Sequence, residues 1–415
     1  MIGQHLFRVY SMLIKELVLD RETLAIRNQS MAEAFHKIPP QHYVRRALLR
    51  TVAKLPISNS KQPNVHRILL IRPDHLGDVL LTTPAIIALR HALPDVELHA
   101  LVGPWSAQVM ANYPEIDSTI TLPFPGFDRS GNKSLQSPYQ LALRTANQLR
   151  QVKYQTAIIF RPDHWWGAMI TYLAGIRERI GYNITDTEPF LTDAITHQHQ
   201  HAVLQNLRLV EKWTGIVNQQ DIEYRFSIQE TDRAYIQGYL QEWGIDDNQA
   251  IMCIHAGSGT WVKRWTPERW ATVADTLSDQ LNVIPIFTGG DHEMPLVQSI
   301  VQHMSNPACV MVGDTQISQL GALFARAKVV IGPDSGPLHL AAALDTPTVT
   351  LFGPADPVEF GAWGSNDKHV ILSSNISCRP CRVLDWGNDD PDYHPCMRDI
   401  TIGQVLEASR RVATR

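Results

Sequence analysis

Cysteine is scarce in this chain of 415 residues, which contains only five. A secreted protein of this size that relied on disulfides would need more, so the count favours a reducing cytoplasm. Long apolar runs are also missing. None reaches the roughly 18 residues of a membrane span, and polar residues interrupt the apolar N-terminus where a signal peptide needs an unbroken core. We therefore expect a soluble, cytoplasmic protein.

An excess of positive charge is absent as well, because 41 acidic residues face 37 basic ones. A general nucleic-acid binder needs a broad positive field, so we expect no nucleic-acid partner and favour a small-molecule or glycan ligand. The length exceeds what one core usually serves and predicts two domains with extensions.

The first 64 residues differ from the rest of the chain. They are typical of helical segments and end in a stretch rich in Pro, Ser and Asn at 55–63, which is typical of a linker. Within them, residues 43–54 are basic and amphipathic. Two interpretations remain open: this helix lies on an anionic membrane surface, or it packs on its own domain.

From residue 65 onward, apolar strands alternate with helical stretches, which predicts the α/β class with parallel sheets. Two such series occur, so we expect two Rossmann-like domains that face each other across a cleft at the carboxyl ends of their strands. Residues 221–228 would connect them. The predicted boundaries are an extension at 1–64, a first domain at 65–225, a second at 226–400 and a C-terminal helix at 401–415. The expected strands lie at 68–71, 96–102, 156–160, 251–255, 283–287, 329–331 and 348–351, and the expected helices at 79–93, 166–174 and 402–412.

The segment from Asp334 to His339 follows a buried strand and predicts an anion site. We expect the hydroxyl of Ser335 to cap a helix in which Pro337 occupies the first turn. The free amides and positive dipole end of that helix favour a phosphate. The candidate ligands are Asp334, Ser335, Gly336, Pro337, Leu338 and His339.

A second loop of the same domain supports this interpretation. Two glycines allow close approach of the backbone, while hydroxyl and basic side chains supply donors and charge for a diphosphate. The alternative is a solvated basic loop over packed tryptophans. The residues concerned are Gly257, Ser258, Gly259, Thr260, Lys263 and Arg264. After the next strand, Asp291 and Glu293 either contact ribose hydroxyls or only cap a turn.

The turn after the first strand of the core holds a single glycine, so the dinucleotide-binding fingerprint is absent. Asp78 lies in the first turn of the next helix, where a carboxylate stays ionised and can accept a proton. Capping that helix is the alternative role. The tetrapeptide Arg-Pro-Asp-His occurs twice, either by chance or as an anion-binding wall for an acceptor made by Arg72, His75, Arg161 and His164.

The C-terminal part carries a weak metal motif. Cys378, Cys381, His394 and Cys396 offer three thiols and one imidazole at uneven spacing. Such a set either binds zinc or, as Cys-x-x-Cys pairs in a reducing compartment often do, binds nothing.

Taken together, residues 75–84, the loop 255–270, Gly289–Asp291 and residues 334–343 resemble the heptosyltransferase family, glycosyltransferase family 9. The resemblance spans about residues 65–412. It implies the GT-B architecture, with the acceptor bound by the first domain and a nucleotide-sugar by the second. It further implies metal-independent, inverting transfer from ADP-heptose, without a cofactor, to the inner core of lipopolysaccharide. Peripheral contact with the inner membrane stays open.

By position, Asp78 matches the catalytic base of the family and Lys263 its diphosphate-binding lysine. Asp334, Ser335, Gly336 and His339 match the motif that holds the donor. The extension is not part of the usual family pattern, and the cysteine-bearing tail lacks one cysteine found in some members. Two other functions stay open: a nucleotide-sugar epimerase of the same architecture, which needs no acceptor, and a non-catalytic nucleotide-binding scaffold. The oligomeric state is not indicated.

Overall fold

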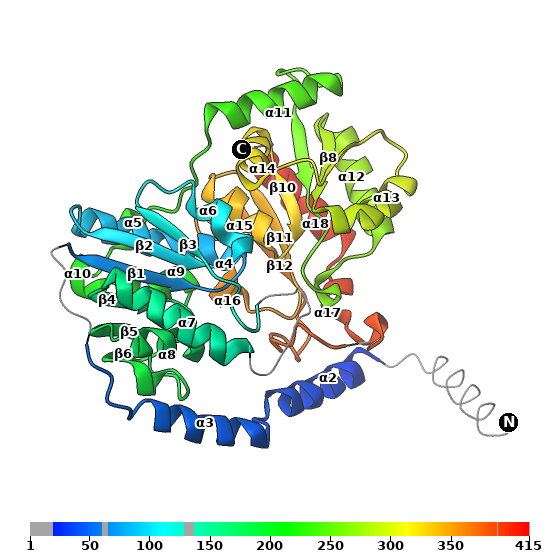
Figure 1. Ribbon diagram of the computed structural model, residues 1–415. Helices are drawn as coiled ribbons and strands as arrows, with labels where there is room; N and C mark the ends of the chain where they lie inside the picture. Colours follow the sequence, from blue (N-terminus) through cyan, green and yellow to red (C-terminus); the bar gives the residue numbers. More distant parts are fainter. Residues whose placement is uncertain (1–19, 60–64, 128–136, 388, 415) are drawn as a thin grey trace, which may run out of the picture.

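The first sheet consists of parallel strands in the order of a doubly wound Rossmann fold. In the computed structural model, which describes residues 20–59, 65–127, 137–387 and 389–414, that order is β3-β2-β1-β4-β5-β6 (Figure 1). In β1 the side chains of Ile68 and Leu70 join the core on one face of the sheet, while Leu69 and Ile71 join the core on the other. A strand buried on both faces is therefore apolar throughout. The strands are β1 (Arg67–Arg72), β2 (Glu97–Val102), β3 (Ser118–Thr121), β4 (Thr156–Ile159), β5 (Glu178–Tyr182) and β6 (Asp193–Ile195).

The second sheet repeats this topology with the order β12-β11-β10-β7-β8-β9, and all its strands are parallel. Strands β7 and β10 thus take the places that β1 and β4 have in the first sheet. The strands are β7 (Ile251–Ile254), β8 (Ile284–Gly289), β9 (Cys309–Val312), β10 (Val330–Pro333), β11 (Thr348–Phe352) and β12 (His369–Ser373).

The helices lie on the faces of the two sheets, as crossover connections between parallel strands require. Those of the first half are α4 (Leu76–Leu80), α5 (Thr83–Ala92), α6 (Ala107–Met110), α7 (Ser137–Val152), α8 (Trp165–Leu173), α9 (Ala202–Arg208) and α10 (Glu211–Thr214). Those of the second half are α11 (Glu230–Glu242), α12 (Pro267–Leu281), α13 (Met294–Gln302), α14 (Ile317–Arg326), α15 (Gly336–Ala343), α16 (Pro357–Phe360), α17 (Pro395–Arg398) and α18 (Ile402–Ala413).

Each sheet has a topological switch point where its strand order reverses. These points lie between β1 and β4 in the first sheet and between β7 and β10 in the second. In open α/β sheets, ligands bind outside the carboxyl ends of the strands at such points. The fold therefore predicts that the loops after these four strands carry the chemistry.

The two halves meet where α4 of the first packs on α15 of the second. The backbones approach closely there: a Cβ atom added to Gly336 would lie 2.9 Å from Cβ of Leu76, and one added to Gly77 would lie 2.8 Å from Cδ2 of His339. One hydrophobic cluster also runs through both halves and contains Ile68 and Ile251. Glycine is required at these two positions by close packing rather than by an unusual backbone angle.

The N-terminal extension forms two helices, α2 (Arg21–His36) and α3 (Pro40–Val52), which lie along one side of the molecule (Figure 1). Helix α3 packs on the first half, where Leu49 is buried and both Arg45 and Arg46 pair with Asp186 at 2.6 and 2.7 Å. Helix α2 packs on the second half. There Arg27 pairs with Asp389 at 2.8 Å, Asn28 donates to the carbonyl of Tyr393 at 2.7 Å, and His36 contacts the carbonyl of Cys381 at 2.9 Å. We call α2 and α3 together the strap.

The predicted class and architecture are confirmed, but several details of the secondary structure differ. The helix expected at 79–93 is two helices, α4 and α5, because the chain bends at Leu81 and Thr82 ahead of Pro84. Strands β3, β5, β6, β9 and β12 were not predicted. The terminal helix α18 packs against α12, β11 and β12 of the second half. Residues 1–19 and 60–64 of the predicted extension lie outside the described residues. In the described part of the chain, every helix is too short or too polar to cross a membrane.

The contact between the two halves is testable by Gly336→Ala. Because the new Cβ would collide with Leu76 in a packed interface, we expect a loss of stability of about 1–3 kcal/mol in urea denaturation and a larger radius of gyration in solution scattering. Gly238→Ala is the control, since nothing lies within 4 Å of a Cβ at this exposed position of α11, and alanine favours the helix. If the two variants have the same stability and the same radius of gyration, the proposed close contact between α4 and α15 is wrong.

Candidate active site

A cleft of about 640 Å³ lies between the two halves, at the carboxyl ends of both sheets. Its volume suits a ligand of the size of a nucleotide-sugar. Both switch points contribute to its walls, as the topology requires. The first half supplies Arg72, His75, Gly77, Asp78 and Arg161 among others, and the second half supplies Gly259, Lys263, Asp334, Ser335, Gly336, Asp356, Glu359 and Arg382.

Asp78 lies in the first turn of α4, as predicted, and lines the cleft. Its Oδ1 accepts a hydrogen bond from Nη2 of Arg72 at 3.2 Å. Burial raises the pKa of Asp78 to about 6, and the negative charges of Asp74 and Asp334 act in the same direction, while Arg72 opposes them. A carboxyl with this pKa is ionised at neutral pH yet is a stronger base than an ordinary aspartate.

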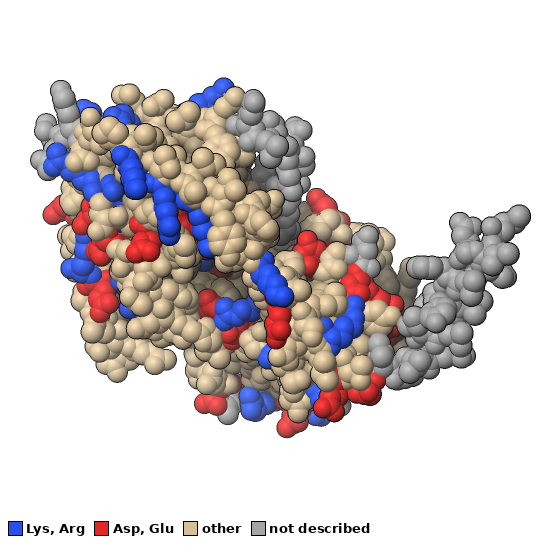
Figure 2. Space-filling model, turned by 90° about the horizontal axis from the view of Figure 1, so that it is seen from below, with Lys and Arg blue, Asp and Glu red and all other residues tan. Residues whose placement is uncertain are grey.

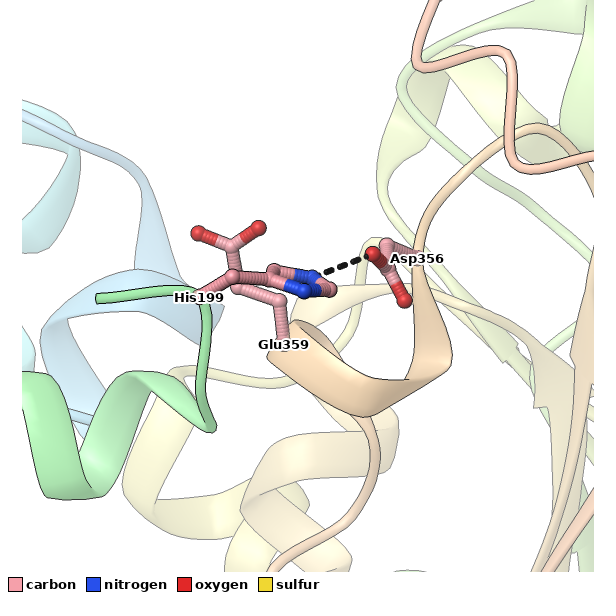
Figure 3. A group of neighbouring side chains, drawn as sticks. All are labelled: His199, Asp356 and Glu359. Carbon is pink, nitrogen blue, oxygen red and sulfur yellow. Dashed lines mark hydrogen bonds and ion pairs between the residues drawn. The ribbon is translucent and has the colours of Figure 1, made fainter.

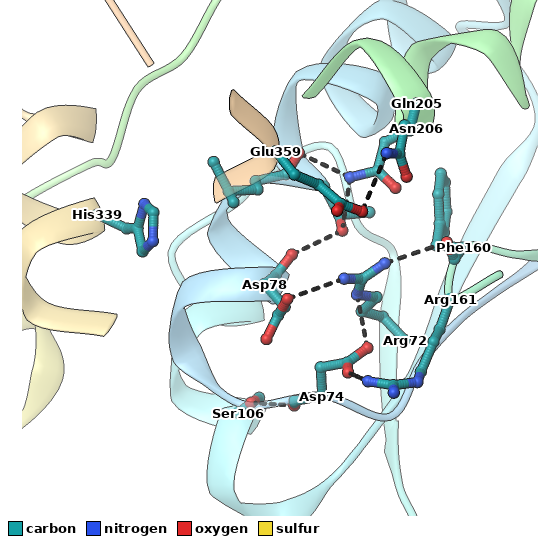
Figure 4. A network of polar contacts seen from close by, with 12 residues as sticks. Arg72, Asp74, Asp78, Ser106, Phe160, Arg161, Gln205, Asn206, His339 and Glu359 are labelled. Atoms are coloured by element: carbon teal, nitrogen blue, oxygen red, sulfur yellow. Dashed lines mark hydrogen bonds and ion pairs between the residues drawn. The ribbon is translucent and has the colours of Figure 1, made fainter. Parts of the chain in front are cut away.

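A buried ion network supports Asp78 from below (Figure 4). Asp74, whose side chain is only 3% exposed, pairs with Nε of Arg72 at 2.8 Å and with Nη1 of Arg161. Burial by itself would raise the pKa of Asp74, but the two guanidinium groups outweigh it and hold the pKa below its usual value. Arg72 also donates to the carbonyl of Phe160 at 3.1 Å. Asp74 therefore anchors the arginine that contacts Asp78.

Facing this network, Lys263 forms an ion pair with Asp334, with Nζ 2.5 Å from Oδ2. Both side chains are largely buried in the wall of the cleft. Lys263 comes from the loop after β7 and Asp334 follows β10, so the pair joins the two strands that flank the second switch point. Positive charge is thereby held at the side of the cleft opposite Asp78.

Ser335 is the residue before the first turn of α15, as predicted, but its hydroxyl does not cap the helix. The Oγ atom is buried and has no hydrogen-bond partner among the described residues. The prediction of a side-chain cap is therefore wrong in this structure, because Oγ makes no hydrogen bond to the amides at the start of α15. Ser335 lines the cleft, so the hydroxyl and the free amides of α15 are available to an anion there.

His339 stands one turn into α15 and faces the helix that bears Asp78 (Figure 4). Its Nε2 lies 3.8 Å from Oδ1 of Asp334. Burial lowers the pKa of His339 to about 4 despite that carboxylate, so the ring is neutral at pH 7. Leu338 is buried in the core and Pro337 occupies the first turn. His339 and Leu338 therefore support the anion site from behind.

Some residues of the loop after β7 line the cleft, and others hold the loop in shape or face away from the cleft. Gly259 and Lys263 line the cleft. Ser258 is buried, and its hydroxyl donates to the carbonyl of Thr260 at 2.6 Å. Arg264 is exposed, and neither it nor Thr260 lines this cleft.

Gly257 of the same loop leaves space for Glu293, because a Cβ there would lie 1.7 Å from Oε1 of that residue. Glu293 is buried and accepts from the amide of Gly290 at 2.9 Å, which is the turn-capping role that the sequence left open for it. Asp291 is exposed beside Gly313. Neither acid lines the cleft described here.

Of the four residues predicted to form an acceptor wall, three line the cleft: Arg72, His75 and Arg161. His75 also contacts the ring of Trp105. His164 instead is buried among aromatic rings, including Phe124 at 5.2 Å, and burial lowers its pKa to about 4. The second copy of Arg-Pro-Asp-His thus contributes its arginine to the cleft and its histidine to the core.

Sequence reasoning missed a charged cluster that joins the two halves and contributes Asp356, Glu359 and Arg382 to the wall of the cleft (Figure 3). His199 of the first half lies 2.8 Å from Oδ2 of Asp356, which follows β11 in the second. Arg382 contacts the same oxygen at 2.5 Å and Glu359 at 2.9 Å. Gln205 donates to Glu359 at 3.2 Å. The signal for Asp356 was its position in the loop after β11, a strand of the same sheet. His199, Gln205 and Arg382 belong to no recognisable motif.

The three side chains in Figure 3 are also the one group of potential metal ligands with atoms within 4.8 Å of one another in the described part of the chain. Arg382, however, already pairs with both carboxylates. The predicted zinc set does not form such a group. His394 bonds to Asp389 at 2.8 Å, and burial, reinforced by Cys381 and Cys378, raises the pKa of the Cys396 thiol to about 12. A thiol with that pKa is protonated at neutral pH unless a metal displaces the proton.

Comparison with known proteins identifies the group to which this site belongs. The model of "Glycosyltransferase family 9 (heptosyltransferase)" matches residues 142–386, which is more than half of the chain. Lipooligosaccharide heptosyltransferase 2 of Haemophilus ducreyi is 25% identical over 82% of this chain and 97% of its own length. The matched region contains Lys263, Asp334 and Ser335, whereas Asp78 precedes it.

Solved structures agree with this match. A glycosyl transferase of family 9 from Veillonella parvula superposes with a TM-score of 0.71 and 25% identity, covering 86% of this chain and 99% of that one. The ADP-heptose lipopolysaccharide heptosyltransferase II of Escherichia coli superposes with a TM-score of 0.65 and 20% identity, covering 84% of this chain and 98% of that one. TibC of E. coli, described as an iron-containing dodecameric glycosyltransferase, superposes with a TM-score of 0.51 and 15% identity, covering 87% of this chain and 78% of that one. With two Rossmann-like halves around a shared cleft and a family match over more than half of its length, the chain is an enzyme of glycosyltransferase family 9.

Proposed function

We propose that the enzyme transfers heptose from ADP-heptose to a lipopolysaccharide core acceptor, with inversion at the anomeric carbon and without a catalytic metal, in the cytoplasm. Two of the relatives named above act, by their names, on lipooligosaccharide or lipopolysaccharide, and one of these two is named for ADP-heptose. We propose further that residues 65–225 bind the acceptor and residues 226–400 the donor.

The observation that carries this proposal is that a carboxylate lines one side of the cleft, while a cation and the N-terminus of a helix line the other side. On the first half stands Asp78, a carboxylate with a raised pKa. On the second half stand Lys263, the hydroxyl of Ser335 and the N-terminus of α15. A transferase needs this separation, because the acceptor loses a proton on one side of the anomeric carbon while a diphosphate departs on the other.

In the proposed reaction Asp78 is the general base. Arg72 occupies its Oδ1, so we place the acceptor hydroxyl at Oδ2. As that hydroxyl oxygen forms its bond to the anomeric carbon, its proton passes to Asp78 and the bond from carbon to the diphosphate oxygen breaks. Attack opposite the leaving group inverts the configuration. Removal of a proton by a positioned base contributes typically a hundredfold to a ten-thousandfold in rate, as an order of magnitude.

The negative charge that develops on the leaving diphosphate needs preorganised donors. Lys263 and the amides at the start of α15 are fixed for this role, the lysine by its ion pair with Asp334 and the amides by the helix itself. The unpartnered hydroxyl of Ser335 supplies a further donor. His339, neutral because its pKa is lowered by burial, would keep Asp334 and thus Lys263 in place.

The direct experiment incubates the purified enzyme with ADP-heptose and a core oligosaccharide freed of its lipid. We expect ADP release coupled to a heptosylated product whose anomeric configuration, read by NMR, is opposite to that of the donor, with the rate unchanged by a chelator. Isomerisation of the donor in the absence of acceptor would instead establish an epimerase. Binding of the donor without turnover of any acceptor would indicate a scaffold.

Asp78→Asn removes the proposed base with minimal change in shape. We expect kcat to fall by about a hundredfold to ten-thousandfold, while the thermal midpoint and ADP binding change little, because the base does not contact the diphosphate. Asp95→Asn, at an exposed turn of the same half, should leave the rate unaltered. A variant at Asp78 that keeps wild-type turnover would exclude this residue as the base.

The pH dependence of kcat/KM tests the ion network. The base acts when ionised, so the rate should rise with pH through the pKa of Asp78, about 6. Asp74→Asn removes one negative charge near Asp78 and leaves Arg72 and Arg161 without their shared counter-ion. Both effects favour the ionised form of Asp78, so the rise of kcat/KM with pH should move to lower pH. If kcat/KM of this variant rises at the same pH as in the unmodified enzyme, or at a higher pH, the role assigned to Asp74 is contradicted.

A further inference from the structure

The strap exposes an unusual amount of apolar surface. Among the residues that the structure describes, eight of the sixteen exposed large hydrophobic side chains lie between residues 26 and 55. In α3 and just after it, Val44 is 64% exposed, Leu48 59% and Leu55 47%. Val44 and Leu48 are four residues apart and therefore lie on one side of α3, and Leu55 follows three residues after the end of the helix. With Phe35, Ile38 and Tyr43 they form what we call the strap face.

Helix α3 presents apolar side chains on two sides, because Leu49 is buried against the first half while other apolar residues face solvent. Arg45 and Arg46 point inward to Asp186, while Val44 and Leu48 point to solvent. A helix that only covered its own domain would place apolar residues inward and charge outward. Concentrated exposed apolar surface of this kind marks an interaction site.

Positive charge surrounds the strap face. Residues 37–54 contain Lys37, Arg45, Arg46, Arg50 and Lys54 and no acidic residue. Of these, Lys37, Arg50 and Lys54 are exposed, and none of the three forms an ion pair with another described residue. Figure 2 looks at the side of the molecule on which the strap lies; Lys and Arg side chains are numerous on its left half, the half of the first sheet, with Asp and Glu side chains among them.

We propose that the strap face docks on an anionic lipid bilayer. Apolar side chains would enter the boundary between headgroups and acyl chains, and the basic rim would contact the anionic headgroups. A second copy of this chain fits less well, because a symmetric contact would oppose the same cations to one another. The proposal rests on the proposed function in one respect: a lipopolysaccharide acceptor is itself anchored in a membrane.

The position of the strap relative to the cleft gives this docking a consequence for the reaction. His36, at the end of α2, contacts the carbonyl of Cys381, and the next residue, Arg382, lines the cleft. Helix α3 meanwhile packs on the half that carries Asp78. A bilayer under the strap would thus hold lipid-linked acceptors near the mouth of the cleft and fix the orientation of both halves.

The test measures co-sedimentation of the full-length enzyme with two kinds of vesicle, one of phosphatidylcholine mixed with phosphatidylglycerol and one of phosphatidylcholine alone. We expect binding to the anionic vesicles that weakens with salt. Leu48→Ser should weaken it about tenfold because one buried aliphatic side chain is lost. Arg50→Gln combined with Lys54→Gln should remove most of the salt dependence.

Ile216→Ser is the matched control, because Ile216 is 83% exposed and lies outside the strap; it should bind like the unmodified enzyme. All the variants replace exposed side chains and should keep the urea midpoint. Vesicle binding that does not respond to Leu48→Ser would overturn the proposal. So would a dimer, detected by sedimentation velocity, that Leu48→Ser dissociates in the absence of lipid.

Activity measured on the same samples separates this proposal from the proposed function. With the lipid-free core oligosaccharide, Leu48→Ser should match the unmodified enzyme, whereas with an acceptor embedded in anionic vesicles it should be about tenfold slower at limiting lipid. If no acceptor is ever heptosylated while vesicle binding follows the expected pattern, the function is wrong and the docking surface stands. Equal rates for both proteins on vesicle-embedded acceptor would refute the docking surface alone.

Discussion

Close contact between two helix starts, α4 on one half and α15 on the other, is the constraint on which the rest of the structure depends. Gly77 and Gly336 meet there, and no side chain larger than hydrogen fits at either place without moving Leu76 or His339. Helix α4 carries Asp78 and helix α15 begins beside Ser335 and Asp334. The two positions that must be small are therefore the ones that bring base and anion site to opposite walls of one cleft.

Electrostatics inside the cleft follow from that contact. Three carboxylates, Asp74, Asp78 and Asp334, stand close enough to raise the pKa of the middle one. Each outer carboxylate has its own cation, Arg161 for Asp74 and Lys263 for Asp334, while Arg72 is shared between Asp74 and Asp78. Asp78 is thus the least compensated of the three. A partly buried carboxylate with incomplete compensation has a raised pKa and can accept a proton near neutral pH, as a base in this place must.

Most of the fold could be predicted because β1, β7 and β10 are apolar runs followed by glycine-bearing turns. Asp78, Lys263 and Ser335 lie in the segments that follow these strands. Edge strands such as β3 and β6 are short and polar, so their pattern carries little signal. Contacts between residues far apart in the sequence could not be predicted from local patterns. Arg161 contacts Asp74 across 87 residues, and Arg382 contacts His199 across 183. The hydroxyl of Ser335 shows a further limit, since propensity identifies the capping position but not the direction in which the side chain turns.

The cluster of His199, Asp356, Glu359 and Arg382 gives the two halves a second contact, and the pair of contacts restricts their relative motion more than either alone. Arg382, itself 44% exposed, pairs with Asp356 and Glu359, whose side chains are 5% and 10% exposed. His199, by contrast, is 57% exposed. The carboxylates and their arginine thus belong to the second half, and the first half contributes the exposed ring of His199 and the amide of Gln205. Such a contact helps to align the two halves around a ligand.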